Sequence, residues 1–184
     1  MKLIFWGLIF LFFDFNLNFG SSSISILPDF AGYALIWKGM KQVECGAYIT
    51  ARPWVCGGII YSAIVWVLNC LGIMAHLTTT ALFAILFGVA GTLIELGVLY
   101  WITKGVCELE QVLEYDLYGK PLKTAWIVLL IWLVLVQVTS LLVMPAIAVI
   151  ALIASFVFMI YYLVRFHKSR KAYEERISWP EEEE

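Results

Sequence analysis

The sequence predicts an all-α membrane protein, a polytopic transmembrane bundle of about six helices. Of its 184 residues, 62% are hydrophobic and only 14% are charged, whereas soluble domains average about 45–50% apolar and about 25% charged residues. The apolar residues also form six runs, and a membrane helix needs about 20 residues to cross a core of roughly 30 Å. Six crossings leave no room for a separate catalytic domain. The composition excludes a soluble domain, a disordered chain and a nucleic-acid-binding protein.

The six apolar runs define the expected helices. They cover residues 2–19, 24–40, 53–75, 78–102, 124–143 and 145–166. The last four are long enough to cross the hydrocarbon at 1.5 Å per residue, while the first two are short and are expected to form a tight hairpin that crosses fully or partly. Because backbone groups in lipid must be paired within a segment, we expect helices and no spanning strands. Residues 1–166 form one expected transmembrane domain, and 167–184 a charged cytoplasmic tail.

Lys2 and the apolar residues after it also resemble a secretory signal peptide. However, Asp14 interrupts the apolar run, and no small-x-small cleavage site follows before Phe19. We therefore expect a retained helix, with cleavage near residues 20–23 as the alternative.

The basic residues predict the orientation. All twelve lie at the N-terminus, in residues 41–53, in residues 103–123, in the C-terminal tail, or at helix ends that face these segments. In a six-helix bundle these segments share one side, and cytoplasmic loops carry an excess of Lys and Arg. Both termini are therefore expected in the cytoplasm. Interfacial aromatic residues mark the same helix ends, namely Trp37, Trp54, Trp101, Trp126, Tyr161 and Tyr162.

Residues 104–118 are predicted to form a cytoplasmic amphipathic helix between two spans. Their apolar side chains recur at spacings of 3, 4 and 4, in Val106, Leu109, Leu113 and Leu117. The other side is mainly acidic, with Glu108, Glu110, Gln111 and Glu114. An acidic face disfavours anionic lipid headgroups, so we expect this helix to pack on its own bundle or on a partner.

Three carboxylates and three amides are the candidate site residues. Asp14 and Asp29 lie toward the outer ends of the two short segments, with Asn16 nearby. Such oxygen-bearing groups can hold a cation or relay protons. The alternative is structural: Asp14 accepts hydrogen bonds where the first helix ends, and Asp29 complements the dipole of the second helix in its first turn.

Glu95 is the only acid within the four long segments. A charge at the bilayer centre costs about 2.5–3.5 kcal/mol on insertion scales. Glu95 should therefore face the bundle interior or be protonated. The functional hypothesis is a proton or cation carrier, and the alternative is an interhelical hydrogen bond with Asn69, Gln137 or Thr139.

The remaining patterns indicate packing. The four cysteines match no metal or redox spacing and are expected to be reduced, with a redox pair of Cys45 and Cys56 as the alternative. Ala84, Gly88 and Thr92 form a small-residue stripe of the kind that lets helices approach closely. No catalytic motif is present, and we expect no cofactor and no metal.

Two segments near the N-terminus carry a resemblance. Residues 12–16 read FFDFN, and residues 26–36 read ILPDFAGYALI, with Gly39 following. This stretch resembles a family of small uncharacterised multi-spanning membrane proteins of Gram-positive bacteria, mainly clostridia and their relatives. The resemblance implies a bacterial plasma membrane and makes the region of Asp14 and Asp29 a defining feature. It implies no activity.

These observations favour a small transport or channel-like protein with membrane-buried carboxylates. The alternatives are a structural or accessory subunit that binds a membrane or cytoplasmic partner, and, least favoured, a lipid-modifying membrane enzyme. Membrane lipids are the expected neighbours, together with a second copy or a membrane-protein partner, and no nucleic acid.

Overall fold

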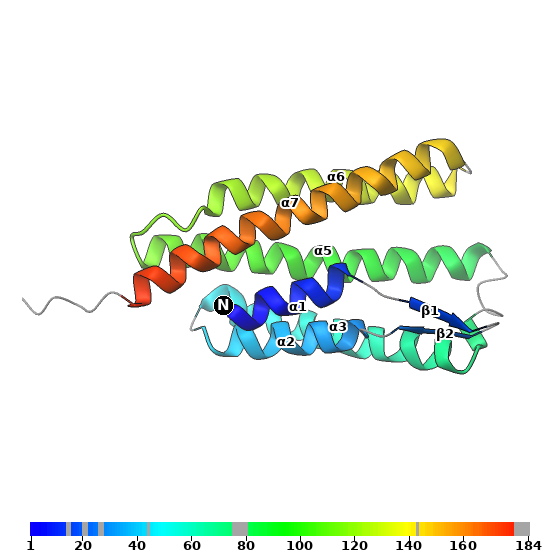
Figure 1. Cartoon of the computed structure of the whole chain (residues 1–184), viewed down its shortest axis with the longest axis horizontal. Helices are drawn as coiled ribbons and strands as arrows, with labels where there is room; N and C mark the ends of the chain where they lie inside the picture. Colours follow the sequence, from blue (N-terminus) through cyan, green and yellow to red (C-terminus); the bar gives the residue numbers. More distant parts are fainter. Residues whose placement is uncertain are drawn as a thin grey trace, which may run out of the picture.

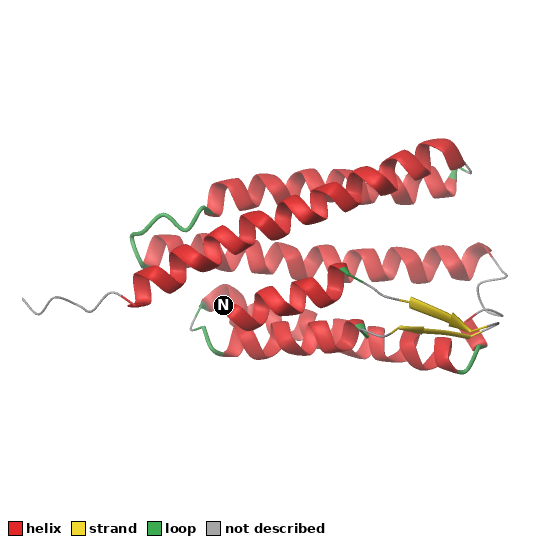
Figure 2. Cartoon of the chain, in the orientation of Figure 1, coloured by secondary structure: helices red, strands yellow, loops and turns green. Residues whose placement is uncertain are grey.

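The computed structural model describes residues 1–13, 16–19, 22–25, 28–43, 45–74, 81–142 and 144–178. Within these ranges, two short and four long helices form a bundle, and one small β-hairpin joins the two short helices (Figures 1 and 2). The elements are α1 (Lys2–Phe12), β1 (Asn16–Phe19), β2 (Ser22–Ser25), α2 (Asp29–Lys41), α3 (Gly46–Cys70), α5 (Ala81–Val112), α6 (Gly119–Leu141) and α7 (Pro145–Ser178). The all-α bundle expected from the sequence is confirmed.

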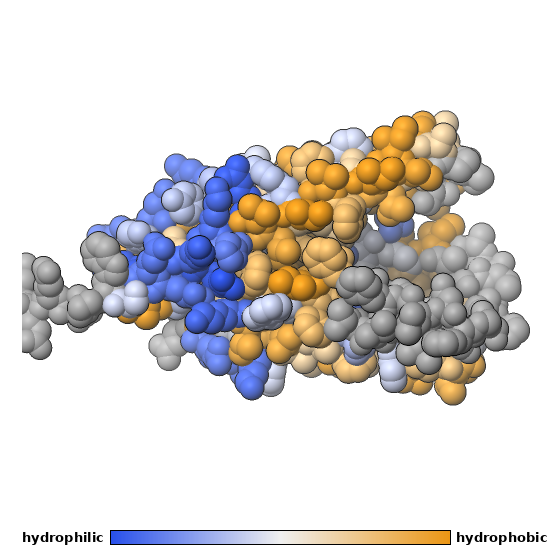
Figure 3. Space-filling view, viewed as in Figure 1, coloured by the Kyte–Doolittle hydropathy of each residue, from blue (hydrophilic) through white to orange (hydrophobic). Residues whose placement is uncertain are grey.

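Four helices, α3, α5, α6 and α7, are long and apolar enough to cross a membrane. They run side by side along the long axis (Figure 1). Only 17–22% of their most apolar stretches is buried inside the chain, so most of this apolar surface is left for lipid. The chain start, the α2–α3 and α5–α6 connections and the end of α7 meet at one end (Figure 1). That end is hydrophilic (Figure 3), as the basic residues predicted.

The first two predicted helices are wrong in length. α1 ends at Phe12 rather than at residue 19, and α2 begins at Asp29 rather than at residue 24. At 1.5 Å per residue their 11 and 13 residues span about 16 and about 20 Å, less than the hydrocarbon core. They reach from the polar end only part of the way along the bundle (Figure 1). The partial hairpin is therefore the alternative that the fold supports.

The antiparallel strands β1 and β2 continue this helical hairpin. Asn16 is paired with Ser25, and Phe19 with Ser22. Asn and Ser compete with the helical backbone through their own hydrogen bonds and are poor residues for a helix interior. The polar residues of this stretch therefore explain why the helix does not continue past Phe12.

The predicted separate amphipathic helix over residues 104–118 is also wrong. α5 runs without interruption to Val112, because Gly105 alone is a weak helix breaker and Val106 is fully buried within the bundle. The tail that was expected from residue 167 is helical in its first part, since α7 continues to Ser178. α3 and α6 begin earlier than expected, at Gly46 and Gly119.

Glycines set the contacts between helices in two ways. α1 and α2 approach backbone to backbone, because a Cβ on Gly7 would lie 2.6 Å from the Gly32 carbonyl oxygen. α3 and α5 instead pack rings of one helix onto glycines of the other. The pairs along this interface are Tyr48 on Gly105, Trp54 on Gly97 and Tyr61 on Gly91. The packed core lies mainly toward the polar end, where Ile4, Ile36, Tyr48, Ile102 and Phe166 are fully buried.

Candidate functional site

Two carboxylates and two phenols lie on α2, α3 and α5, where α3 packs against both of the other helices. Asp29 is the first residue of α2, and Glu95 lies near the middle of α5. Asp29 and Glu95 lie within electrostatic range of each other. The Tyr33 phenol lies within that range of both carboxylates, and the Tyr61 phenol lies within that range of Asp29. The two acids stand 66 positions apart in the sequence.

The start of α2 is positioned by aromatic contacts with α3. Tyr33 packs on Gly58, where an added Cβ would lie 2.9 Å from the ring. Phe30 meets Trp66 edge to face, with the ring centroids 5.8 Å apart. A side chain larger than glycine at position 58 would push α2 away, and Asp29 would move with it.

Tyr61 ties α3 to α5 beside the carboxylates. Its hydroxyl donates a hydrogen bond to the Phe87 carbonyl oxygen at 2.6 Å, and its ring end lies over Gly91, one turn before Glu95. The two helices are therefore held in a fixed register at this depth.

Glu95 contributes a buried side-chain oxygen, Oε1, to the site. This atom has no hydrogen-bond partner in the part of the chain that the structure describes. A buried carboxylate oxygen without a partner is costly unless the group is protonated or paired with a cation. Glu95 is therefore the candidate site residue to which the structure draws most attention.

None of the three predicted partners bonds to Glu95 among the described residues. Gln137 donates instead to the Thr92 hydroxyl at 2.8 Å, which places it one turn from Glu95 on the α5–α6 interface. The Thr139 hydroxyl donates to the Leu135 carbonyl oxygen in its own helix at 2.8 Å. Asn69 lies in the last turn of α3. The interhelical bond considered as an alternative for Glu95 is therefore not seen with these residues, and Gln137 forms an interhelical bond to Thr92.

The structure describes only part of the two candidates Asp14 and Asn16. Asp14 lies outside the described residues. Asn16 begins β1, opposite Ser25, and its side chain also lies outside the described part. The predicted grouping of Asp14 with Asp29 stays a prediction.

Two acids of the acidic face expected over residues 104–118 have structural roles. Glu108 accepts hydrogen bonds from the backbone amides of Gly46 and Ala47, both at 2.8 Å, and so caps the start of α3. Glu110 accepts bonds from the amides of Leu117 at 3.2 Å and Gly119 at 2.7 Å, at the start of α6. Carboxylates complement the positive end of a helix. The sequence gives no signal for these contacts, which join residues of different helices.

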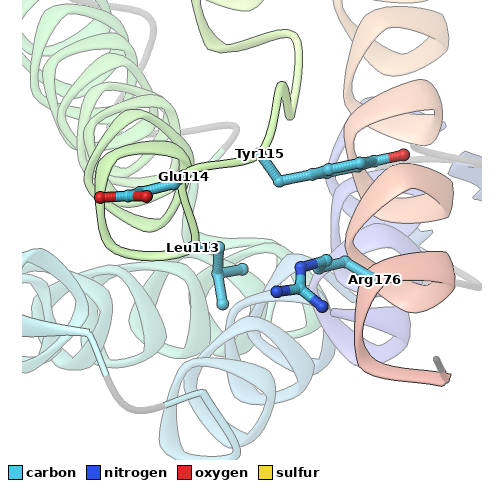
Figure 4. Close-up of a pocket in the computed structure, with 4 residues that line it drawn as sticks. All are labelled: Leu113, Glu114, Tyr115 and Arg176. Atoms are coloured by element: carbon cyan, nitrogen blue, oxygen red, sulfur yellow. The ribbon is translucent and has the colours of Figure 1, made fainter. Parts of the chain in front are cut away.

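The polar end also holds open cavities. One, of about 420 Å³, is lined by Leu113, Glu114, Tyr115 and Arg176. Tyr115 reaches from the α5–α6 connection toward α7, Arg176 points back from α7 toward Leu113, and Glu114 points away from both (Figure 4). Glu114 therefore does not neutralise Arg176.

The described residues offer no group of three His, Cys, Asp or Glu side chains that could hold a metal ion. All four cysteines are free thiols. Cys45 is buried and Cys56 is exposed, so the structure does not contain the redox pair considered as an alternative.

No protein-family model, no curated protein and no solved structure matches the chain. The similarity to a family of clostridial membrane proteins therefore stays an expectation.

Proposed function

We propose that this chain is a small membrane transport protein that moves protons or monovalent cations through the carboxylates of Asp29 and Glu95. The observation that carries the proposal is the buried Glu95 Oε1 atom, without a hydrogen-bond partner among the described residues. Asp29 lies within electrostatic range of this carboxyl. A second like charge in the same low-dielectric region disfavours charging both groups at once, which favours a proton or a cation at the site.

The depth of the pair supports the proposal. Ionisable residues inside membrane segments are costly and typically mark ion pathways or proton relays. Glu95 lies near the middle of α5, one of the four helices long enough to span. An acid with a purely structural role would be expected to have a fixed hydrogen-bond donor, as Glu108 has.

The start of α2 partway along the bundle also supports the transport proposal. α2 begins partway along the bundle (Figure 1), and Asp29 lies in its first turn. Helices that start or stop within the membrane are common at transporter binding sites, where their ends face the ion or substrate. Asp29 stands at the positive end of the α2 dipole, and we assign the exchange of the bound proton or cation to Glu95.

The test is gradient-driven flux in proteoliposomes. The purified protein is reconstituted into vesicles, and proton, sodium and potassium gradients are imposed one at a time while an entrapped dye reports the flux. We expect flux of at least one of these ions with the native protein, and its loss in Glu95→Gln. Asp29→Asn should reduce it strongly.

Glu114→Gln is the matched control, because it makes the same chemical change at an exposed residue of the polar end. Equal flux in the native protein and Glu95→Gln would overturn the assignment of the site. Absence of flux for all three ions in native vesicles would overturn the transport proposal itself.

A further inference from the structure

A second feature lies at the polar end, far from the carboxylates. A cavity of about 330 Å³ lies between the α5–α6 connection and α7. It is lined by Tyr115, Tyr118, Arg165, Lys168, Lys171, Ala172 and Glu175. We refer to it as the basic groove.

The charge of the basic groove is unbalanced. Three cationic side chains from α7 face one acid, Glu175. None of Arg165, Lys168 and Lys171 forms an ion pair in the described part of the chain, where Arg170 and Glu174 do so at 3.6 Å. This excess of cations over acids in the lining of one cavity attracts an anion.

The other wall supplies hydroxyl groups. Tyr115 and Tyr118 are 40% and 42% exposed, so their phenols remain available to a ligand. The backbone of Tyr118 is held in the left-handed region, at φ 58°, and its amide donates to the Asp116 carboxylate at 2.8 Å. This tight turn fixes the backbone of Tyr118, and both tyrosines line the cavity opposite the helix. Cationic groups with hydroxyl donors are the usual partners of a phosphate group.

The position of the groove favours a lipid phosphate. On α7 the side chains of Val157, Ile160 and Val164 are exposed and apolar, and they lead directly to Arg165. The Arg165 guanidinium stacks on Tyr161 at 4.9 Å, as aromatic and basic residues do at a membrane interface. Acyl chains would lie along the apolar stretch while the headgroup reaches the cations.

We propose that the basic groove binds the phosphate group of an anionic phospholipid. Arg165 and the two lysines contact the phosphate, and the tyrosines donate hydrogen bonds from the other wall. This site is independent of the carboxylate pair and of the proposed transport activity.

The test is native mass spectrometry of the detergent-solubilised full-length protein, titrated separately with phosphatidylglycerol, cardiolipin, phosphatidylcholine and glycerol phosphate. The test variant is Lys168→Gln combined with Lys171→Gln. The matched control is Lys38→Gln combined with Lys120→Gln, which removes the same charge from exposed residues that line none of the described cavities. Elution as a monodisperse species verifies that each variant is folded.

We expect an anionic lipid to bind the native and control proteins more tightly than phosphatidylcholine does. Each lysine near a charged membrane surface contributes about fivefold in affinity, so the test variant should bind roughly 25-fold more weakly. Equal affinities for anionic lipid and phosphatidylcholine, or equal losses in both double variants, would overturn the proposal. Glycerol phosphate binding as tight as that of the lipid would overturn the lipid assignment.

Discussion

Gly7 of α1 and Gly32 of α2 face each other so closely that a Cβ on either residue would meet the carbonyl oxygen of the other, at 2.6 and 2.9 Å. Because those atoms belong to the backbone, they cannot move aside as a flexible side chain can. This contact joins the two short helices and so holds the first turn of α2, with Asp29, at its depth in the bundle.

Gly32→Ala should therefore destabilise the protein. Overpacking of a tight contact costs about 1–3 kcal/mol, and unfolding in denaturing detergent, followed by circular dichroism, measures the loss. Gly57→Ala is the matched control, because nothing lies within 4 Å of an added Cβ there. Equal stability of the two variants would contradict the close contact.

The cap that Glu108 provides should be measurable in the same assay. Glu108→Ala removes both hydrogen bonds to the start of α3. Because the bond to the Gly46 amide is exposed and water can replace it, we expect a loss of about 0.5–2 kcal/mol, as for the removal of a helix N-cap side chain. Glu175→Ala changes an exposed acid at the same end and should change the stability by less than about 0.5 kcal/mol. A Glu108 variant as stable as the native protein would show that these bonds contribute nothing.

The thiol of Cys45 should react slowly. It is 5% exposed, and burial raises its pKa, so a smaller fraction is thiolate at pH 8 than in a free cysteine. A protein that keeps Cys45 alone should therefore react with iodoacetamide more slowly than a cysteine-free protein with Lys120→Cys, which is exposed at the same end. Similar rates in the folded proteins would contradict the burial of Cys45. In denaturant the difference should disappear.

Gln137 and Thr92 should act as a structural pair. Hydrogen bonds between membrane helices average about 0.6 kcal/mol in double-mutant cycles, so Thr92→Val and Gln137→Leu should be coupled by about that amount. We expect Gln137→Leu to keep the ion flux, because its bond is to Thr92. Loss of flux in a folded Gln137→Leu protein would extend the ion pathway to this interface.

The long helices could be predicted from the sequence because their signal is local, a run of apolar residues of sufficient length. The ends of α1 and α2 could not, because hydropathy alone does not separate a short helix from a full span. The continuation of α5 through Lys104 and Gly105 was missed for a related reason: a helix leaving the membrane shows the same amphipathic pattern as a separate one.

The individual residues of the site can be predicted from the sequence, but their arrangement in space cannot. Glu95 and Asp29 stand out because charged residues are rare in apolar segments. Their proximity depends on the depth at which α2 begins and on Tyr33 packing on Gly58, and neither is encoded locally. The same holds for Glu108 and Glu110, whose partners lie on other segments.

Difference infrared spectroscopy of the reconstituted protein shows whether the carboxylates of Asp29 and Glu95 hold an exchangeable proton or cation. Spectra are recorded as the pH is raised and as sodium or potassium is added. We predict that a protonated carboxyl band of the native protein is lost in one of these steps and is missing from Glu95→Gln throughout. A native spectrum without such a band, or a band that persists in both Glu95→Gln and Asp29→Asn, would rule out an exchangeable proton or cation at this pair.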